Sequence, residues 1–194
     1  MQTIAWDVDD VLNDLMRVWF EQEWLPKHPA CIMRYHAITE NPPDKLLGIR
    51  MEDYLDSLDR FRLSHTVRLL DPVPEVLDWF RQYGHHFRHI ALSATPLKSA
   101  HILADWVINH YGNWIRSFNF VPSARENHSV IMYDSTKADY LQWWGKVDVL
   151  IDDTLIHIEA ARQLGIKTLI MPRPWNKSHH TVSDMLNTLT KFTN

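Results

Sequence analysis

The residues best suited to chemistry in this sequence are polar side chains that each follow a short apolar segment. They are Asp7, Asp9, Ser93, Asp152 and Asp153, and the segments before them are 3–6, 89–92 and 147–151. Short apolar runs of this kind are typical of buried strands. Because the carboxyl ends of the strands in a doubly wound sheet share one edge, we expect these side chains to meet there.

Adjacent carboxylates at such an edge favour a metal site. Asp152 and Asp153 are neighbours in the sequence, and their charges repel each other unless a cation relieves the repulsion. Mg²⁺ prefers carboxylate and carbonyl oxygens, and together with one lysine it can neutralise a phosphate ester for attack. Lys137 begins a predicted helix at 136–144, which can bring its ammonium group to the same place.

The segments that position these residues alternate between strand and helix. Strands are expected at 3–6, 89–92, 118–121, 147–151 and 167–171, with a further short one at 129–133. Helices are expected at 11–24, 51–61, over about ten residues from 74, and at 98–111, 136–144, 156–164 and 182–189. This alternation predicts an α/β fold in which a doubly wound parallel sheet carries helices on both faces.

A long irregular region follows the first helix. It contains prolines at 26 and 29 and the breaker Asn41–Pro42–Pro43. Because the region is too long for an ordinary crossover, we interpret residues 15–70 as a small helical cap. Residues 1–14 and 71–194 then form the α/β core.

Four segments, in this order, resemble the four sequence motifs of the haloacid dehalogenase superfamily. They are Trp6–Leu12, Ile90–Ser93, Thr136–Leu141 and Val149–Asp153. The cap-sized insert also falls between the first and second of them, where that superfamily places its first type of cap. The resemblance covers the whole chain, and it implies a magnesium-dependent phosphatase with a Rossmann-like core.

The resemblance also implies a role for each matching residue. Asp7 would be the nucleophile that forms an aspartyl-phosphate, and Asp9 the general acid and base. Ser93, Ala94 and Lys137 would bind the phosphoryl group. Magnesium would be held by Asp7, by Asp9 through its backbone carbonyl, and by Asp152 and Asp153.

The phosphate-binding segment offers two hydroxyl groups, on Ser93 and Thr95. We choose Ser93 because it directly follows the predicted strand. Thr95 is then expected to be the N-cap of the helix that begins at Pro96. The backbone amides near Ala94 and Asp10 are expected to hold the equatorial phosphoryl oxygens.

Two finer segments resemble the 5'(3')-deoxyribonucleotidase branch, namely 7–14 and Arg173–Asn176. Asp10 and Ser93 depart from that branch, which has Gly and Thr there. We therefore expect a nucleoside monophosphate as the substrate, with another small metabolite such as a sugar phosphate as the alternative. A further alternative is a phosphate- or metal-binding module without catalysis.

Three aromatic residues follow the first motif, Trp19, Phe20 and Trp24. They can stack on a nucleotide base, but aromatic residues at helical spacing more often pack a cap against a core.

Composition limits the classes of partner. The net charge is −4 and no basic block is present, which disfavours nucleic acid polymers and anionic membranes. The single cysteine, Cys31, excludes an internal disulfide. No apolar run reaches the length of a membrane span, and no signal peptide is recognisable. The expectation is a cytoplasmic protein that acts on a small phosphorylated substrate.

Overall fold

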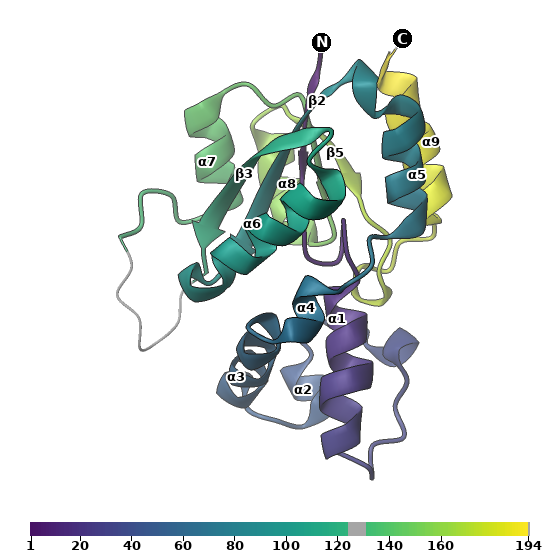
Figure 1. The fold of residues 1–194 in the computed structure, drawn as a ribbon, viewed down its shortest axis with the longest axis vertical. Coiled ribbons are helices and arrows are strands. Elements are labelled where there is room, and N and C mark those ends of the chain that lie inside the picture. The colour runs from purple at the N-terminus through teal and green to yellow at the C-terminus, as the bar shows by residue number, and fades with distance from the viewer. Residues whose placement is uncertain (124–130, 194) are drawn as a thin grey trace.

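Five parallel strands form the central sheet of the protein, whose computed structural model describes residues 1–123 and 131–193. In chain order the strands are β1 Thr3–Trp6, β2 Arg88–Thr95, β3 Ile115–Pro122, β4 Val149–Asp152 and β5 Lys167–Ile170. Across the sheet they lie in the order β3-β2-β1-β4-β5 (Figure 1). The predicted fold class is confirmed. The order reverses between β1 and β4, and in such sheets ligands bind at the carboxyl ends of the strands beside this reversal.

Helices cover both faces of the sheet (Figure 1). One face carries α5 Pro74–Tyr83, α6 Leu97–Tyr111 and α9 Val182–Thr190, and the other carries α7 Lys137–Trp144 and α8 Leu155–Gln163. Short 3₁₀ turns lie at Gly84–His86, Pro174–Asn176 and Lys191–Thr193. Alternate residues of a strand point to opposite faces, so Ile4 and Trp6 pack in the cluster with α5, α6 and α9, whereas Ala5 packs in the cluster with α7 and α8.

Residues 15–70, which we call the cap segment, lie beyond the carboxyl ends of the strands (Figure 1). Its elements are α1 Leu15–Val18, a π-helix Trp19–Trp24, 3₁₀ turns Leu25–Lys27 and Tyr35–Ala37, and α2 Asp44–Leu47, α3 Met51–Arg62 and α4 His65–Arg68. Its two connections to the sheet run side by side, because Asn13 forms an antiparallel bridge with Pro72 and the Val73 amide donates to the Leu12 carbonyl at 2.9 Å. These contacts support the division near residues 14 and 71, which stays our interpretation.

The first helix begins later than predicted, at Leu15 instead of residue 11. Asp10 adopts the left-handed backbone conformation with φ 62°, which stops a helix and which Asp tolerates better than most residues. Val11 and Leu12 are fully buried within this loop, so their apolar character reflects burial and not helix periodicity. The Asp10 carboxylate then accepts the amide of Met16 at 2.9 Å and so caps the late helix.

The second strand is longer than predicted, because β2 continues through Ser93 to Thr95. Ser93 therefore lies within the strand and not after it. Thr95 is not the helix N-cap, since Pro96 holds that position and the Thr95 hydroxyl lies 3.2 Å from the Ser99 hydroxyl. The short strand expected at 129–133 falls partly outside the described residues, and its described part, 131–133, is not a strand.

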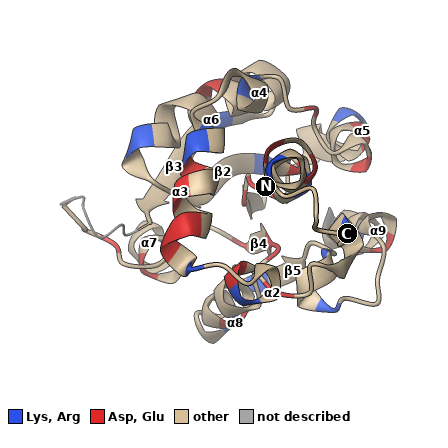
Figure 2. Cartoon of the chain, turned by 90° about the horizontal axis from the view of Figure 1, so that it is seen from below, with Lys and Arg blue, Asp and Glu red and all other residues tan. Residues whose placement is uncertain are grey.

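Charged residues of both signs are interspersed along the helices in the view from the cap segment (Figure 2). In the described parts of the chain, no helix combines the length and the apolar character that crossing a membrane requires.

Aromatic packing beneath the sheet gives a test of stability. Phe80 of α5 is fully buried, and its ring centroid lies 4.7 Å from those of Trp6 and His89. We expect Phe80→Ala to lower the free energy of unfolding by about 3–5 kcal/mol, because it removes a buried ring and leaves a cavity. Ile108→Ala, at a position 48% exposed on α6, is the control and should change it by less than about 0.5 kcal/mol. Urea unfolding measures both, and equal losses would contradict this assignment of the core.

Candidate active site

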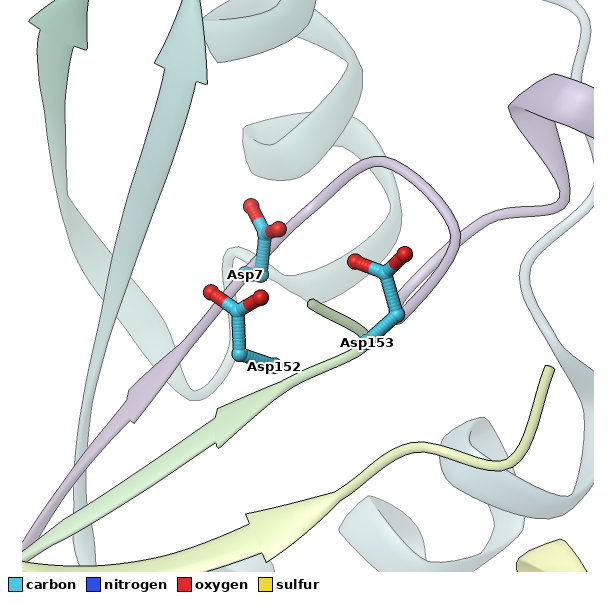
Figure 3. Close-up of side chains that lie close together, drawn as sticks. All are labelled: Asp7, Asp152 and Asp153. Carbon is cyan, nitrogen blue, oxygen red and sulfur yellow. The ribbon is translucent and has the colours of Figure 1, made fainter. Parts of the chain in front are cut away.

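Three carboxylates converge where the strand order reverses (Figure 3). Asp7 follows β1, Asp152 ends β4, and Asp153 comes next. The Asp7 amide donates to the Ile151 carbonyl at 2.9 Å, so the pairing of β1 with β4 continues up to the site. One oxygen from each carboxylate lies within 4.8 Å of the others, and all three residues are buried. The sheet therefore brings Asp7 to two adjacent acidic groups that lie about 145 residues further along the sequence.

Lys137 is the counter-ion of this cluster. Its side chain is only 1% exposed, and its Nζ lies 2.8 Å from Asp7 Oδ2 and 2.6 Å from Asp152 Oδ2. A capping box fixes the start of α7, because the Thr136 hydroxyl accepts the Asp139 amide and the Asp139 carboxylate accepts the Thr136 amide. The lysine is thus held at the first position of its helix and is buried, although a lysine there is usually solvated.

His157 is a fourth neighbour that the sequence did not indicate. Its Nδ1 lies 3.1 Å from Asp152 Oδ1 and 3.2 Å from Asp152 Oδ2. The Thr154 amide also donates to Asp152 Oδ1, at 2.9 Å. One feature of the sequence could have pointed to His157, namely its position in the first turn of α8, shortly after the two aspartates.

Burial and neighbouring charges give the three carboxyl groups different pKa values. Burial acts to raise the pKa of Asp152, but Lys137 and His157 outweigh it and lower that pKa to about 2. Burial raises the pKa of Asp7 to about 6, with Lys137 opposing the shift. Burial, together with the charges of Asp152 and Asp7, raises the pKa of Asp153 well above its usual value. Asp153 is therefore the carboxyl that most needs an additional cation.

The 3₁₀ turn Pro174–Asn176, which follows β5, holds Asp153 in place. Trp175 Nε1 donates to Asp153 Oδ2 at 2.8 Å, and Asn176 Nδ2 donates to the Asp153 carbonyl at 2.8 Å and to the Met171 carbonyl at 2.7 Å. The Trp-Asn pair that sequence resemblance linked to nucleotidases thus orients an acidic group of the site.

The donor set fits a divalent cation of the magnesium type. All three groups offer carboxylate oxygens, the ligands that Mg²⁺ prefers. Both oxygens of Asp152 already have two close partners, from Lys137, His157 and the Thr154 amide. The two oxygens share the one His157 nitrogen, so Asp152 keeps less acceptor capacity than a carboxylate without these partners. Asp7 and Asp153 keep free acceptor capacity and would hold the cation, with Asp152 acting through Lys137.

Asp9 lies apart from the three converging carboxylates. Its Oδ1 accepts a hydrogen bond from Asn13 Nδ2 at 3.3 Å, and its Oδ2 accepts one from Arg62 Nη2 at 3.2 Å. Arg62 belongs to α3 of the cap segment, 53 residues away in the sequence. No local pattern marked this arginine, because its neighbour comes from another part of the fold.

A small cavity of about 110 Å³ joins these groups. Asp7, Asp9, Asp153, Ser93 and Ala94 line it from the core side. The cap segment supplies the remaining side of its wall, including Leu15, Met16, Asn41, Tyr54, Leu58 and Arg62.

Ser93 is only 1% exposed, so it contributes to the cavity from a buried position. A larger concavity, of about 690 Å³, lies among residues at the amino ends of β2 and β3. We place the site in the small cavity because the carboxylates converge there.

The aromatic residues Trp19, Phe20 and Trp24 are buried and are not among the residues that line the cavity. Trp19 Nε1 donates to Ser57 Oγ at 3.2 Å, and its ring lies 5.3 Å from that of Tyr54. These residues therefore serve packing and not the cavity wall, but the contacts of Trp19 lie within the cap segment and not, as was expected, between cap and core.

The loop after β1 is tied down by Arg173. Its Nε donates to the Asp10 carbonyl at 2.6 Å, and its Nη2 lies 2.8 Å from Asp14 Oδ1. The Asp10 amide, expected to hold a phosphoryl oxygen, instead donates to Asn13 Oδ1 at 3.2 Å. Burial raises the pKa of Asp10 to about 7, with Arg173 opposing the shift.

Comparison with known proteins identifies the fold. A scan against protein-family models and a search of curated proteins gave no match. A protein from Thermotoga maritima assigned as a β-phosphoglucomutase is 16% identical, with a TM-score of 0.56 over 98% of this chain and 99% of that one. YfnB of Bacillus subtilis, described as a HAD-type hydrolase and bound to magnesium, is 13% identical, with a TM-score of 0.54 over 100% and 98%.

Protein tyrosine kinase A of Mycobacterium tuberculosis is also similar, with 14% identity and a TM-score of 0.60 over 97% of each chain. The structural similarity establishes a shared fold, the haloacid dehalogenase-like fold, over nearly the whole chain. At identities this low it establishes the fold alone. Since one fold hosts several chemistries, the function has to be argued from the site.

The electrostatics of the site predict how Mg²⁺ stabilises the protein at different pH values. Asp7, with its pKa raised to about 6, and Asp153 retain protons to higher pH in the folded protein than in the unfolded chain. Without metal, the stability that Asp7 contributes is present at low pH and is lost as the pH rises through about 6. The contribution of Asp153 changes in the same direction, because its pKa is also raised. Because Mg²⁺ competes with these protons, it should raise the melting temperature more at pH 8 than at pH 5.

At ten times its Kd, Mg²⁺ adds about 1.4 kcal/mol, or about 3–6 °C for a chain of this size. Thermal melts with and without Mg²⁺ at the two pH values measure this difference. Asp153→Asn should remove most of the shift at pH 8. An unchanged shift in that variant would place the cation elsewhere.

Proposed function

We propose that this protein is a magnesium-dependent phosphate monoester hydrolase that acts through an aspartyl-phosphate on Asp7. The observation that carries the proposal is the buried Lys137, which lies within 2.8 Å of Asp7 and 2.6 Å of Asp152, next to Asp153. Burying so many charges is costly for a fold and is rarely done for stability alone. The arrangement suits a site that receives a phosphate dianion and a divalent cation.

In the first step, an Asp7 carboxylate oxygen attacks phosphorus and the bond from phosphorus to the ester oxygen breaks. Lys137 at Oδ2 and the Val8 amide, which donates to Oδ1 at 2.7 Å, hold the plane of this carboxylate. Asp9 gives a proton to the departing alkoxide. Ser93 and the backbone at Ala94, on the cavity wall, would hold the phosphoryl oxygens.

In the second step, Asp9 takes a proton from a water molecule, and the water oxygen attacks the phosphorus of the aspartyl-phosphate. The bond from phosphorus to Asp7 breaks, which releases inorganic phosphate and restores the carboxylate. Bound Mg²⁺ would offset the negative charge of the phosphoryl group and of Asp7. Asp7, Asp153 and the Asp9 carbonyl would hold it, and the magnesium-bound state of YfnB supports this choice of ion.

The alternative of a non-catalytic binding module has less support. A binding site for phosphate needs Lys137 and a cation, but it needs neither a nucleophile nor an acid. Asp7 and Asp9 nevertheless both line the cavity.

For the substrate, we propose a nucleoside monophosphate, on the basis of the segments 7–14 and 173–176. The cavity of about 110 Å³ is below the 300–1,000 Å³ that is common for small-molecule sites, so a nucleotide requires the cap segment to move outward. A sugar phosphate is the second candidate, favoured by the similarity to the protein assigned as a β-phosphoglucomutase.

Replacing the nucleophile tests the mechanism. We expect Asp7→Asn to abolish phosphate release from 4-nitrophenyl phosphate, because the amide cannot form the acyl phosphate, while the fold is retained. Phosphate release measures the effect, and circular dichroism checks the fold. Turnover near the wild-type rate would refute the covalent route. Lack of release by the wild-type protein from any phosphate ester would refute the enzymatic function itself.

A screen of phosphate release with Mg²⁺ tests the substrate class. Nucleoside 5'- and 3'-monophosphates, in ribo and deoxy forms, are expected to give higher kcat/KM than sugar phosphates. A clear preference for sugar phosphates would overturn the nucleotide assignment and leave the phosphatase proposal standing.

A further inference from the structure

We propose that Arg62 of the cap segment is a positioning residue for Asp9, so that Asp9 is aligned for proton transfer only when the cap segment is docked on the core. The inference rests on the proposed function, because it concerns the acid–base step at that site. It assigns to a residue of α3 a part in the reaction that no sequence motif indicates.

The first support is how Asp9 is held. In the described parts of the chain, its carboxylate has hydrogen bonds with two side chains, those of Asn13 and Arg62. Arg62 directs two nitrogens at the same oxygen, with Nη2 at 3.2 Å and Nε at 3.4 Å from Oδ2. The contact from Asn13 to Oδ1 is 3.3 Å long and comes from the same loop. Arg62 therefore supplies the restraint that comes from outside the loop.

The second support is how Arg62 itself is held. Its Nη1 lies 3.2 Å from Asp59 Oδ1, one turn earlier on α3. Asp59 is only 2% exposed, and its Oδ2 lies 3.3 Å from Nζ of Lys98 on α6. The four charges form a continuous row from the core helix, through the cap helix, to the candidate acid. A guanidinium group fixed at one end in this way has little freedom to leave the other end.

The third support is that the row crosses between the cap segment and the core twice. Lys98 and Asp9 belong to the core, and Asp59 and Arg62 belong to α3. The side chains of Arg62 and Asp9 are each only 13% exposed, so solvent screens this pair weakly. By contrast, Arg68 of α4 and Asp105 of α6 form a cap–core ion pair at 3.2 Å with side chains 42% and 56% exposed. That exposed pair is the natural control.

Docking of the cap segment affects the reaction through the position of the Asp9 carboxyl group. Asp9 must pass its proton to the ester oxygen as the bond from phosphorus to oxygen breaks, and this transfer needs a heavy-atom distance of about 2.6–3.2 Å. When the cap segment moves outward, Arg62 leaves with α3, and Asn13 is then the one side chain among the described residues that stays bonded to the Asp9 carboxylate. Proton donation then works in the docked state and fails in the open one. Water entering the open site would thus meet a poorly aligned acid and base.

The dependence of the first-turnover rate on the leaving group distinguishes a positioning role of Arg62 from a structural or substrate-binding role. Glycerol 2-phosphate expels a basic alkoxide that needs the proton, whereas 4-nitrophenyl phosphate expels a stable phenolate that needs it far less. General acid assistance is worth roughly 10²–10⁴-fold, so Arg62→Ala should slow the first turnover of the alkyl ester about tenfold or more. The aryl ester should lose less than about threefold. Rapid-quench measurement with enzyme in excess gives both rates.

A double-mutant cycle identifies the partner. If Arg62 acts through Asp9, adding Arg62→Ala to Asp9→Asn should cause no further loss that is specific to the alkyl ester. Arg62→Lys keeps the charge but not the fork of nitrogens, and should recover less than half of the loss in logarithmic rate. Arg68→Ala, which breaks the exposed ion pair, should leave the ratio of alkyl to aryl rates unchanged. Melting temperatures of all variants show whether the fold is retained.

Three results would overturn the inference. Equal losses for the two esters would make Arg62 a structural residue or a binding group for the phosphate itself. A full further loss in the Asp9→Asn background would mean that it acts on something else. A rise in KM with kcat unchanged for both esters would make it a substrate-binding residue. In each case a wild-type protein that hydrolyses both esters, with Asp7→Asn inactive, would leave the proposed function intact.

Discussion

The structure around the site depends on one buried ammonium group, that of Lys137. A charge at 1% exposure is tolerated only when opposite charges surround it, and Asp7 and Asp152 meet this need from adjacent strands. Burial acts to lower the pKa of Lys137, but these two carboxylates outweigh it and raise that pKa. The sheet order, which places β1 beside β4, and the capping box, which fixes the first turn of α7, are the conditions that bring the three groups together.

A second layer of residues determines what each carboxylate can do. His157 and the Thr154 amide occupy Asp152, which leaves it as a partner of Lys137. Trp175 and Asn176 orient Asp153 and leave it acceptor capacity. At metal sites, partners of this kind fix the orientation of the residues that ligate the ion. Two neighbouring aspartates with the same chemistry thereby have different surroundings, because Asp152 contacts an ammonium group and a backbone amide, whereas Asp153 contacts a hydroxyl and an indole.

The same fold supports proteins described as a hydrolase, a mutase and a tyrosine kinase, so the architecture alone does not select a reaction. In this chain the cap segment closes the cavity to about 110 Å³ and contributes Arg62 beside Asp9. In the proposed mechanism the acid–base residue Asp9 would thus be held by groups from both core and cap, whereas the nucleophile Asp7 would be held by the core alone. Under that proposal, proton transfer would depend on the docking of a helical segment, as it does for lids that complete a site on closing.

The sequence by itself determined the sheet and the positions of Asp7, Asp152 and Lys137 at its edge, because short apolar runs, helix periodicity and capping residues are local signals. It misplaced the start of the first helix, since Val11 and Leu12 are apolar for burial in a loop whose left-handed Asp10 the pattern does not reveal. It placed Ser93 after a strand that in fact continues to Thr95. Only the tertiary structure decided that Arg62 and Trp175 are partners of the acids, because contacts between residues 53 and 22 positions apart leave no periodic trace in the chain. His157 is only five residues from Asp152, but apolar periodicity does not mark that contact either.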